Sequence, residues 1–376
     1  MKSNTKKLEN SQSQSEKVFD AHIHYLFDIP LPKTIDIFER EFAETATKKG
    51  CFLSIPHETT EGNKSIYYDD MQNIKALVLK RAFSPDFYAF AGLVHPQDYS
   101  DEKAVADSFA RQVEKFAMVG YDGMKMLEGY PSLLKLRKVP LDSKIYDKYY
   151  SFIEESGMPI TMHIANPAEN WDITKASKHA IESGRVYDGT YPTKSEITEQ
   201  TFNVLKKHPK LSLALAHCGF FSYDISQAEY FMGEFENTIL DITPGGEQLI
   251  NMSLDWDRWL KFFEKYQDRI IYGSDYYAFP DEDEEEWRTC FTRRPRFLRQ
   301  FFETDSEHLY VDRSFKGINL DPKLRKKLYW DNSMRIFGEP KKVSTSYIRQ
   351  EAEKLIGKEH HSKYAEEDLK YIIENV

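Results

Sequence analysis

Two histidines two residues apart, His22 and His24, have the residue type and spacing for metal chemistry. They close the apolar segment VFDAHIHY (18–25), which also contains Asp20. A β-strand points alternate side chains to one face, so both imidazoles are expected on one face at the carboxyl end of the strand. Neutral imidazole binds zinc, manganese or iron. The alternative is a pair of buried, hydrogen-bonded histidines.

Three further polar residues end apolar segments elsewhere: His163 in TMHIA, His217 in LALAHCG and Asp275 in IYGSD. The small neighbours Thr161 and Ala165 leave room for a metal beside His163. A carboxylate at the mouth of a barrel is costly unless a cation or strong donors meet it. Asp275 is therefore expected to bind a metal, although an Asp there could instead cap the next helix.

These residues need elements that bring them together, and the chain alternates short apolar segments with longer amphipathic ones. This rhythm is typical of βα units and a parallel sheet. Eight strands are expected, at residues 18–25, 51–56, 87–96, 123–129, 159–165, 211–219, 239–245 and 270–275.

Helices are expected between the strands, where apolar residues recur every three or four positions. The clearest helical segments cover residues 34–49, 102–119, 144–156 and 255–268. Gly50, Gly120 and Gly157 are each expected to end a helix, because glycine adopts the left-handed conformation without a Cβ penalty.

An α/β fold, a (β/α)8 TIM barrel with a C-terminal helical extension, accommodates this pattern best. A doubly wound open sheet uses the same local pattern, but the first strand is not followed by the G-x-G-x-x-G of a dinucleotide site. Barrel closure also makes strands 1 and 8 neighbours, which would bring His22 and His24 to Asp275.

Three regions are expected: a flexible tail at 1–16, a metal-dependent catalytic barrel at 17–340, and a charged helical extension at 341–376. The extension could pack on the barrel or on a neighbouring subunit.

The composition argues against several classes of partner. A formal net charge of -10 and the lack of a basic stripe exclude nucleic acid. No uncharged apolar run approaches the roughly 18 residues that span a bilayer, so no membrane partner is expected. Three cysteines far apart in sequence form no disulfide framework, which favours a reducing, cytoplasmic location.

From Val18 to about Gly338 the sequence resembles the amidohydrolase superfamily, in the amidohydrolase-related branch that contains hydrolases and the aminocarboxymuconate-semialdehyde and resorcylate decarboxylases. The resemblance lies in FDAHIH, MHIANP, HPKLSLALAHCG, YGSD and YWDNSMRIFG.

The resemblance implies one divalent metal ion bound by His22, His24, His163 and Asp275. Zinc is the first expectation, and manganese or iron would also accept these ligands. It further implies a catalytic role for His217, which would orient or activate a water or polarise the substrate, while Asp275 could also carry the proton.

Lys125, in GMKML, lies where some relatives carry a carbamylated lysine that bridges two metals and others a residue that contacts substrate. A lysine paired with a nearby carboxylate is the structural alternative. One metal is the expectation here.

Loops after strands build the pocket of a barrel enzyme, which makes Asn166 and Trp171 candidate substrate contacts. His57 and His95 end strands and could also face the pocket. Glu196 follows Thr193 at the spacing of a capping box, so a structural role is expected for it.

The expected activity is hydrolysis of a C–N or C–O bond in a small molecule by metal-activated water. The alternative is decarboxylation of a small aromatic or unsaturated acid with the same ligands. A binding protein that has lost catalysis is a third reading, which the intact residue set opposes. The partner is a small-molecule substrate, and a homodimer is compatible with such a barrel.

Overall fold

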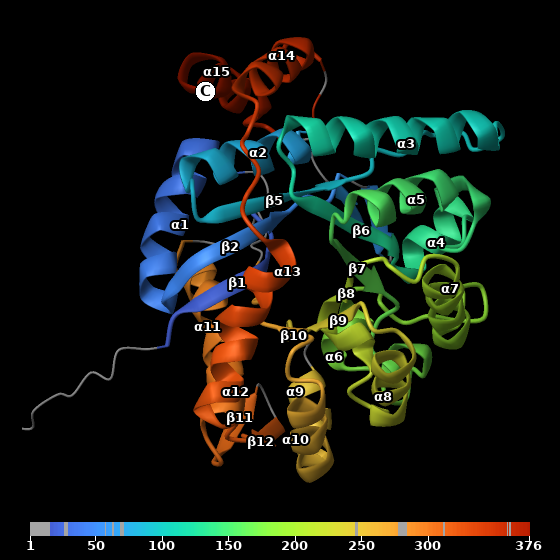
Figure 1. Ribbon diagram of the computed structural model, residues 1–376, viewed down its shortest axis with the longest axis vertical. Coiled ribbons are helices and arrows are strands. Elements are labelled where there is room, and N and C mark those ends of the chain that lie inside the picture. The colour runs from blue at the N-terminus through green and yellow to red at the C-terminus, as the bar shows by residue number, and fades with distance from the viewer. Residues whose placement is uncertain are drawn as a thin grey trace, which may run out of the picture.

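Eight parallel strands form a barrel with helices around it in the computed structural model (Figure 1). The structure describes residues 16–25, 29–56, 58–61, 64–67, 71–244, 247–276, 284–310, 313–358, 360 and 362–376. In barrel order the strands are β1 (Val18–Ile23), β2 (Thr47–Leu53), β5 (Phe87–Gly92), β6 (Gly123–Gly129), β7 (Ile160–Ile164), β8 (Leu213–Leu215), β9 (Thr238–Asp241) and β10 (Ile270–Ile271). All eight predicted strands are present, and the predicted TIM barrel is confirmed.

The first and last strands meet through the residues that follow β10. Ile23 forms a parallel bridge with Tyr276. The backbone N–H of Ala21 donates to Tyr272 O at 2.9 Å, and that of His24 to Tyr276 O at 2.9 Å. These contacts close the ring and bring the ends of β1 and β10 together, as the predicted metal site requires.

The helices cover the outside of the barrel and extend it at both ends (Figure 1). They are α1 (Leu31–Thr45), α2 (Gln72–Ala82), α3 (Glu102–Val119), α4 (Pro131–Arg137), α5 (Asp147–Ser156), α6 (Lys178–Glu182), α7 (Lys194–Lys207), α8 (Ile225–Glu234), α9 (Gln248–Leu254), α10 (Trp256–Lys265), α11 (Glu284–Glu303), α12 (Pro322–Lys326), α13 (Asn332–Phe337), α14 (Thr345–Leu355) and α15 (Ala365–Asn375). Within the described ranges, none of the helices combines the length with the apolar character needed to cross a bilayer.

Glycine ends two helices as predicted and does not end a third. Gly120 after α3 has φ +113° and Gly157 after α5 has φ +69°, both left-handed. Gly50 instead lies inside β2, where an added Cβ would come within 2.6 Å of Ile23 Cδ1. The prediction was wrong because α1 already ends at Ala46, which takes the left-handed conformation with φ 59°.

Two short antiparallel hairpins interrupt the βα rhythm and were not predicted. β3 (Glu58–Glu61) pairs with β4 (Lys64–Tyr67), and β11 (Glu307–Tyr310) pairs with β12 (Arg313–Lys316). Neither belongs to the barrel sheet.

An aromatic cluster fills the barrel at the amino-terminal ends of its strands. Phe337 of α13 contacts Phe19 of β1, and Tyr88 and Phe90 of β5, at ring-centroid distances of 5.4, 5.8 and 5.3 Å. Apolar packing at this end leaves the carboxyl ends of the strands for polar residues, the arrangement in which barrel enzymes place their active sites.

The C-terminal helical extension is present and packs on the barrel's own helices. α14 contacts α2, and α15 contacts α1, so both lie at one end of the molecule (Figure 1). Buried Asp368 of α15 accepts the backbone N–H of Leu31, the first residue of α1, at 2.6 Å. Its other oxygen forms an ion pair with buried Lys75 of α2 at 2.8 Å.

The predicted tail at 1–16 lies mostly outside the described residues. Its last residue, Glu16, forms an ion pair with Arg325 at 2.6 Å.

Candidate metal centre

His22 of β1 and His24, which follows the strand, converge through their Nε2 atoms, which lie 3.2 Å apart. The Nδ1 of His22 donates to Asp241 Oδ2 at 2.5 Å, and the Nδ1 of His24 donates to Leu53 O at 3.0 Å. Each partner fixes the proton on Nδ1, so each Nε2 keeps a free lone pair. Two ligand atoms therefore face one point.

Asp275 brings its carboxylate to the same point. Its Oδ1 lies 3.5 Å from the Nε2 of both His22 and His24. The backbone N–H of Asp275 donates to His22 O at 2.8 Å, and its φ is 52°. Such a left-handed backbone is uncommon for a residue other than glycine and is concentrated at functional sites.

His217 begins a run of left-handed residues after β8. His217, Cys218, Gly219 and Phe220 have φ of 55°, 49°, 61° and 53°. The N–H of His217 donates to the Thr243 hydroxyl at 3.0 Å, while its Nδ1 has no hydrogen-bond partner within the described part of the chain. This turn redirects the chain so that the imidazole faces the barrel axis.

Ligand atoms of His22, His217 and Asp275 lie within 4.8 Å of one another, and all three residues are buried. One ion with bonds of about 2.0–2.2 Å separates its ligand atoms by roughly 3–4 Å. The group is therefore close to the size of a single-ion site.

His163 lies beside this group, and its Nε2 has another partner. Its Nε2 donates to Ala165 O at 2.9 Å, which leaves Nδ1 as the nitrogen for a metal. Its ring lies 5.0 Å from that of His217 and 5.4 Å from Phe220. Ala165 has φ 54°, and this reversal of the backbone turns its carbonyl back toward the imidazole.

Burial keeps these imidazoles neutral. It lowers the pKa of His22, His24 and His163 well below the usual value for histidine, and that of His217 to about 3. Nearby positive charge on Lys125 lowers them further. Since a metal binds the neutral imidazole, the site is prepared for an ion at neutral pH.

The carboxylates differ in their electrostatics. Burial raises the pKa of Asp241 to about 7, opposed by Lys125. Burial also acts to raise the pKa of Asp275, but Arg294 and the site histidines outweigh it and lower that pKa. Asp275 is therefore an anion, as a ligand must be.

Lys125 of β6 enters the group directly. Its Nζ lies 3.2 Å from His22 Nε2, and its side chain is buried. Burial lowers its pKa to about 8, opposed by the charge of Asp275. A lysine this close to a metal position can contact a substrate there.

Asn166 and Trp171 lie in the loop after β7, with their side chains engaged outside the group. Asn166 Nδ2 donates to the Tyr187 hydroxyl at 2.5 Å. Trp171 Nε1 donates to Pro192 O at 3.1 Å, and its ring lies 4.7 Å from that of Tyr187. Both side chains therefore pack within the loop region after β7.

The remaining candidates have structural partners or lie outside the described residues. His95 contacts Glu128 and Tyr99, each at 2.6 Å. The predicted capping box of Thr193 and Glu196 is confirmed at the start of α7. His57 lies outside the described residues.

Two residues of the centre were not found by sequence reasoning. Asp241 ends β9, and an acid in the apolar segment ILDIT was a signal that could have identified it. Arg294 of α11 donates to both the side chain and the backbone carbonyl of Asp275. Nothing in the basic segment around Arg294 distinguishes it from its neighbours.

The donor set fits a divalent metal ion. Two imidazole Nε2 atoms and one carboxylate oxygen converge in a buried space, and acceptors hold the Nδ1 atoms of both His22 and His24. Nitrogen and oxygen donors suit zinc, manganese and iron.

Known proteins match the chain in sequence profile and in fold. A sequence profile described as Amidohydrolase matches residues 71–338, and no curated protein sequence matches. An uncharacterized TIM-barrel protein from Bordetella bronchiseptica has a TM-score of 0.55 at 12% identity, over 85% of this chain and 98% of that one. A candidate 2-pyrone-4,6-dicarboxylic acid hydrolase from Pseudomonas putida has 0.50 at 11%, over 86% and 97%.

A dihydroxybenzoic acid decarboxylase from Polaromonas sp. JS666, solved with manganese and the inhibitor 2-nitroresorcinol, has a TM-score of 0.48 at 16% identity, over 86% of this chain and 97% of that one. At such low identities these likenesses concern the fold.

Proposed function

Because the chain belongs to the amidohydrolase family, we propose that it is a metal-dependent hydrolase that cleaves a C–N or C–O bond of a small molecule by metal-activated water. The observation that carries the proposal is the convergence of His22, His24 and Asp275 on one buried point, with His217 beside it. We assign the activity to the barrel, residues 17–340.

We propose that His22, His24, His163 and Asp275 hold one ion, with zinc first and manganese or iron as alternatives. When bound, such an ion lowers the pKa of a water molecule and polarises a carbonyl or carboxylate oxygen. For His163 to hold the ion through Nε2, its hydrogen bond to Ala165 O would have to break, whereas Nδ1 would not require that change.

His217 and Asp275 would manage protons. The Nδ1 of His217 has no hydrogen-bond partner among the described residues, so the neutral ring can accept a hydrogen bond from water there. Burial lowers its pKa to about 3, so the ring favours orienting that water over holding its proton. Asp275 Oδ2 is paired with Arg294 while Oδ1 faces the histidines. Oδ1 is therefore the oxygen available to the reacting groups.

Decarboxylation is the second candidate, and the cations of the centre favour it. Lys125 lies 3.2 Å from His22 Nε2, and Arg294 contacts Asp275. Two cationic side chains around a metal position suit a substrate that carries a carboxylate. In this reading Lys125 binds the acid group, and Asn166 and Trp171 would line the rest of the substrate.

Metal analysis of protein purified without chelators tests the shared basis of both candidates. About one equivalent of metal per chain is expected in the wild type. The His22→Ala, His24→Ala double variant should lose it while keeping its circular dichroism spectrum. A folded wild type that binds no added zinc, manganese or iron would contradict the proposal.

Product analysis separates the candidates. Hydrolysis in 18O-labelled water places the label in the product, whereas decarboxylation of an aromatic or unsaturated acid releases CO2. The His217→Asn variant should keep its metal and lose about 100-fold or more in kcat in either case. Unchanged kcat in that variant would remove His217 from the mechanism.

A further inference from the structure

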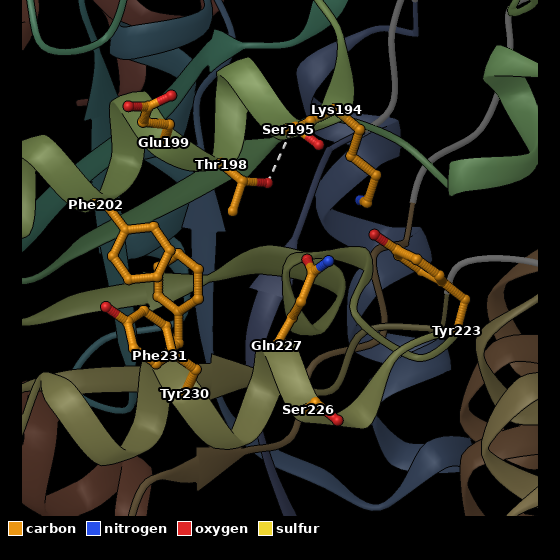
Figure 2. A pocket seen from close by; sticks show the side chains of 10 residues that line it. All are labelled: Lys194, Ser195, Thr198, Glu199, Phe202, Tyr223, Ser226, Gln227, Tyr230 and Phe231. Atoms are coloured by element: carbon orange, nitrogen blue, oxygen red, sulfur yellow. Dashed lines mark hydrogen bonds between the residues drawn. The ribbon is translucent and has the colours of Figure 1, made fainter.

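A cavity of about 360 Å³ lies between α7 and α8, outside the metal centre. Its lining comes from the two helices and the turn that precedes α8: Lys194, Ser195, Thr198, Glu199, Phe202, Tyr223, Ser226, Gln227, Tyr230 and Phe231. In Figure 2, Lys194 and Tyr223 approach each other at one end, while Phe202, Tyr230 and Phe231 gather at the other. The cavity thus has one cationic end and one aromatic end.

Lys194 is a buried cation with no carboxylate partner among the described residues. The residue is 8% exposed. Its Nζ donates to the backbone oxygens of Asn166 at 3.1 Å and Gly219 at 3.5 Å. Glu169 attracts it from a distance, and burial still lowers its pKa to about 7. Burying an ammonium group without an anion is costly, so an anionic ligand would stabilise this arrangement.

Aromatic rings surround the ammonium group. Its Nζ lies 5.6, 5.7 and 5.4 Å from the ring centroids of Phe220, Phe221 and Tyr223. Burial raises the pKa of Tyr223, whose phenol therefore remains a neutral hydroxyl donor beside Lys194. An ammonium and a hydroxyl at one end of a cavity are suitable donors for a carboxylate.

The other end of the cavity is apolar and open to solvent. Tyr230 is 48% exposed, and its ring lies 4.8 Å from that of Phe202 at a tilted angle. Phe231 lies 4.2 Å from Phe202 on the other side. Glu199, the acidic residue of the lining, is solvent-exposed. These rings offer contact to an aromatic or aliphatic body.

We propose that this cavity binds a small organic acid, with the carboxylate on Lys194 and Tyr223 and the apolar body against Phe202 and Tyr230. A volume of about 360 Å³ is within the range of small-molecule sites. The site is separate from the metal centre, so it does not depend on the proposed hydrolase or decarboxylase activity.

The position of Lys194 also connects the cavity to the metal centre. Asn166 follows His163 by three residues, and Gly219 follows His217 by two. The ring of Phe220, which Lys194 faces, stacks on His217 at 4.9 Å. Lys194 therefore contacts both of the loops that carry His163 and His217.

Binding of 3-phenylpropionate, compared with its neutral analogue 3-phenylpropanol, tests the site by calorimetry. The acid is expected to bind the wild type about ten-fold more tightly than the alcohol. Lys194→Met should abolish this preference, and Lys194→Arg should retain most of it. Tyr230→Ala should weaken both ligands to a similar degree.

Two control variants separate the cavity from a general effect of surface charge and from the metal centre. Lys207→Met removes an exposed positive charge from the same helix, one that pairs with Asp147 and not with the cavity lining, and should leave the preference intact. The His22→Ala, His24→Ala variant should still bind the acid, because the cavity does not contain the metal ligands. Circular dichroism confirms that each variant is folded.

Any of these results would overturn the proposal: equal affinity of the wild type for acid and alcohol, an unchanged preference in Lys194→Met, or acid binding that disappears in the histidine double variant. The last would assign the acid to the metal centre. Failure of the acid to bind at about 1 mM would also overturn it. The metal content of the wild type is measured separately, so failure of the metal-dependent activity would be recognised on its own.

Discussion

Asp241 determines which nitrogen of His22 faces the metal position. Its carboxylate holds Nδ1 at 2.5 Å, and its other oxygen accepts the N–H of Thr243 at 3.1 Å. Such second partners orient metal-binding histidines and raise their basicity. Asp241 thus belongs to the site through its contact with His22, although it would not touch the ion itself.

Asp241→Asn is expected to weaken zinc affinity about 10–100-fold, because the amide cannot hold the Nδ1 proton as the carboxylate does. A competition titration with a chromogenic chelator measures this change. Asp255→Asn, at the exposed position that precedes α10, is the matched control and should leave affinity unchanged. Equal affinities of the Asp241 variant and the wild type would contradict the role of this pair.

At the residue scale, the sequence predicts the types and approximate places of the centre's side chains. His22 and His24 could be placed because strand alternation is a local property. Arg294 could not, because its contact with Asp275 depends on how α11 packs over the barrel mouth. His163 meets the carbonyl of Ala165 because Ala165 has a left-handed backbone. Alanine has no preference for that conformation, so the sequence does not reveal this contact.

At the scale of elements, Gly273 allows β1 to approach the end of β10. An added Cβ there would lie 2.6 Å from Asp241 Oδ1 and 2.7 Å from His22 Cβ. Both neighbours belong to the metal centre, so neither can move without disturbing it.

Gly273→Ala is therefore expected to reduce zinc affinity and to destabilise the fold by about 1–3 kcal/mol, the usual cost of overpacking. Zinc titration and chemical denaturation measure the two effects. Gly189→Ala is the control, since an added Cβ there meets no atom within 4 Å. A Gly273 variant with normal metal affinity would show that the close approach is not needed.

Strand positions were predictable, but their ends were not. Periodicity locates β8 and β10 within the expected segments 211–219 and 270–275, although the strands themselves cover only Leu213–Leu215 and Ile270–Ile271. After β8 and β10 the backbone enters left-handed conformations, which include His217 and Asp275. Hydrophobic patterns do not record such turns, because the turning residues are as buried as the strands.

At the scale of the whole molecule, Asp368 links the C-terminal extension to the first two βα units. Asp368→Ala would remove the carboxylate that pairs with the buried Lys75 ammonium group at 2.8 Å and accepts the Leu31 N–H at 2.6 Å. Removal of one partner of a buried ion pair costs about 3–5 kcal/mol.

Chemical denaturation of the Asp368→Ala variant measures that loss of unfolding free energy. Glu367→Ala, at the exposed neighbouring position, should change it by less than about 0.5 kcal/mol. Equal unfolding free energies of the two variants would mean that Asp368 does not stabilise the contact between the extension and the barrel.

Sequence alone could not choose between the barrel and another subunit as the surface on which this extension packs, since either offers a surface for an amphipathic helix.

The same carboxylate bears on how a newly made chain acquires its fold. While the ribosome is still adding the middle βα units, the α1 amino terminus and the Lys75 side chain have already emerged, but Asp368 has not been synthesised. The α1 amino terminus and Lys75 therefore gain their contacts with Asp368 only after the last helix has been synthesised, and until then the nascent amino-terminal half lacks this part of its native packing, the state in which partly folded chains are prone to aggregate.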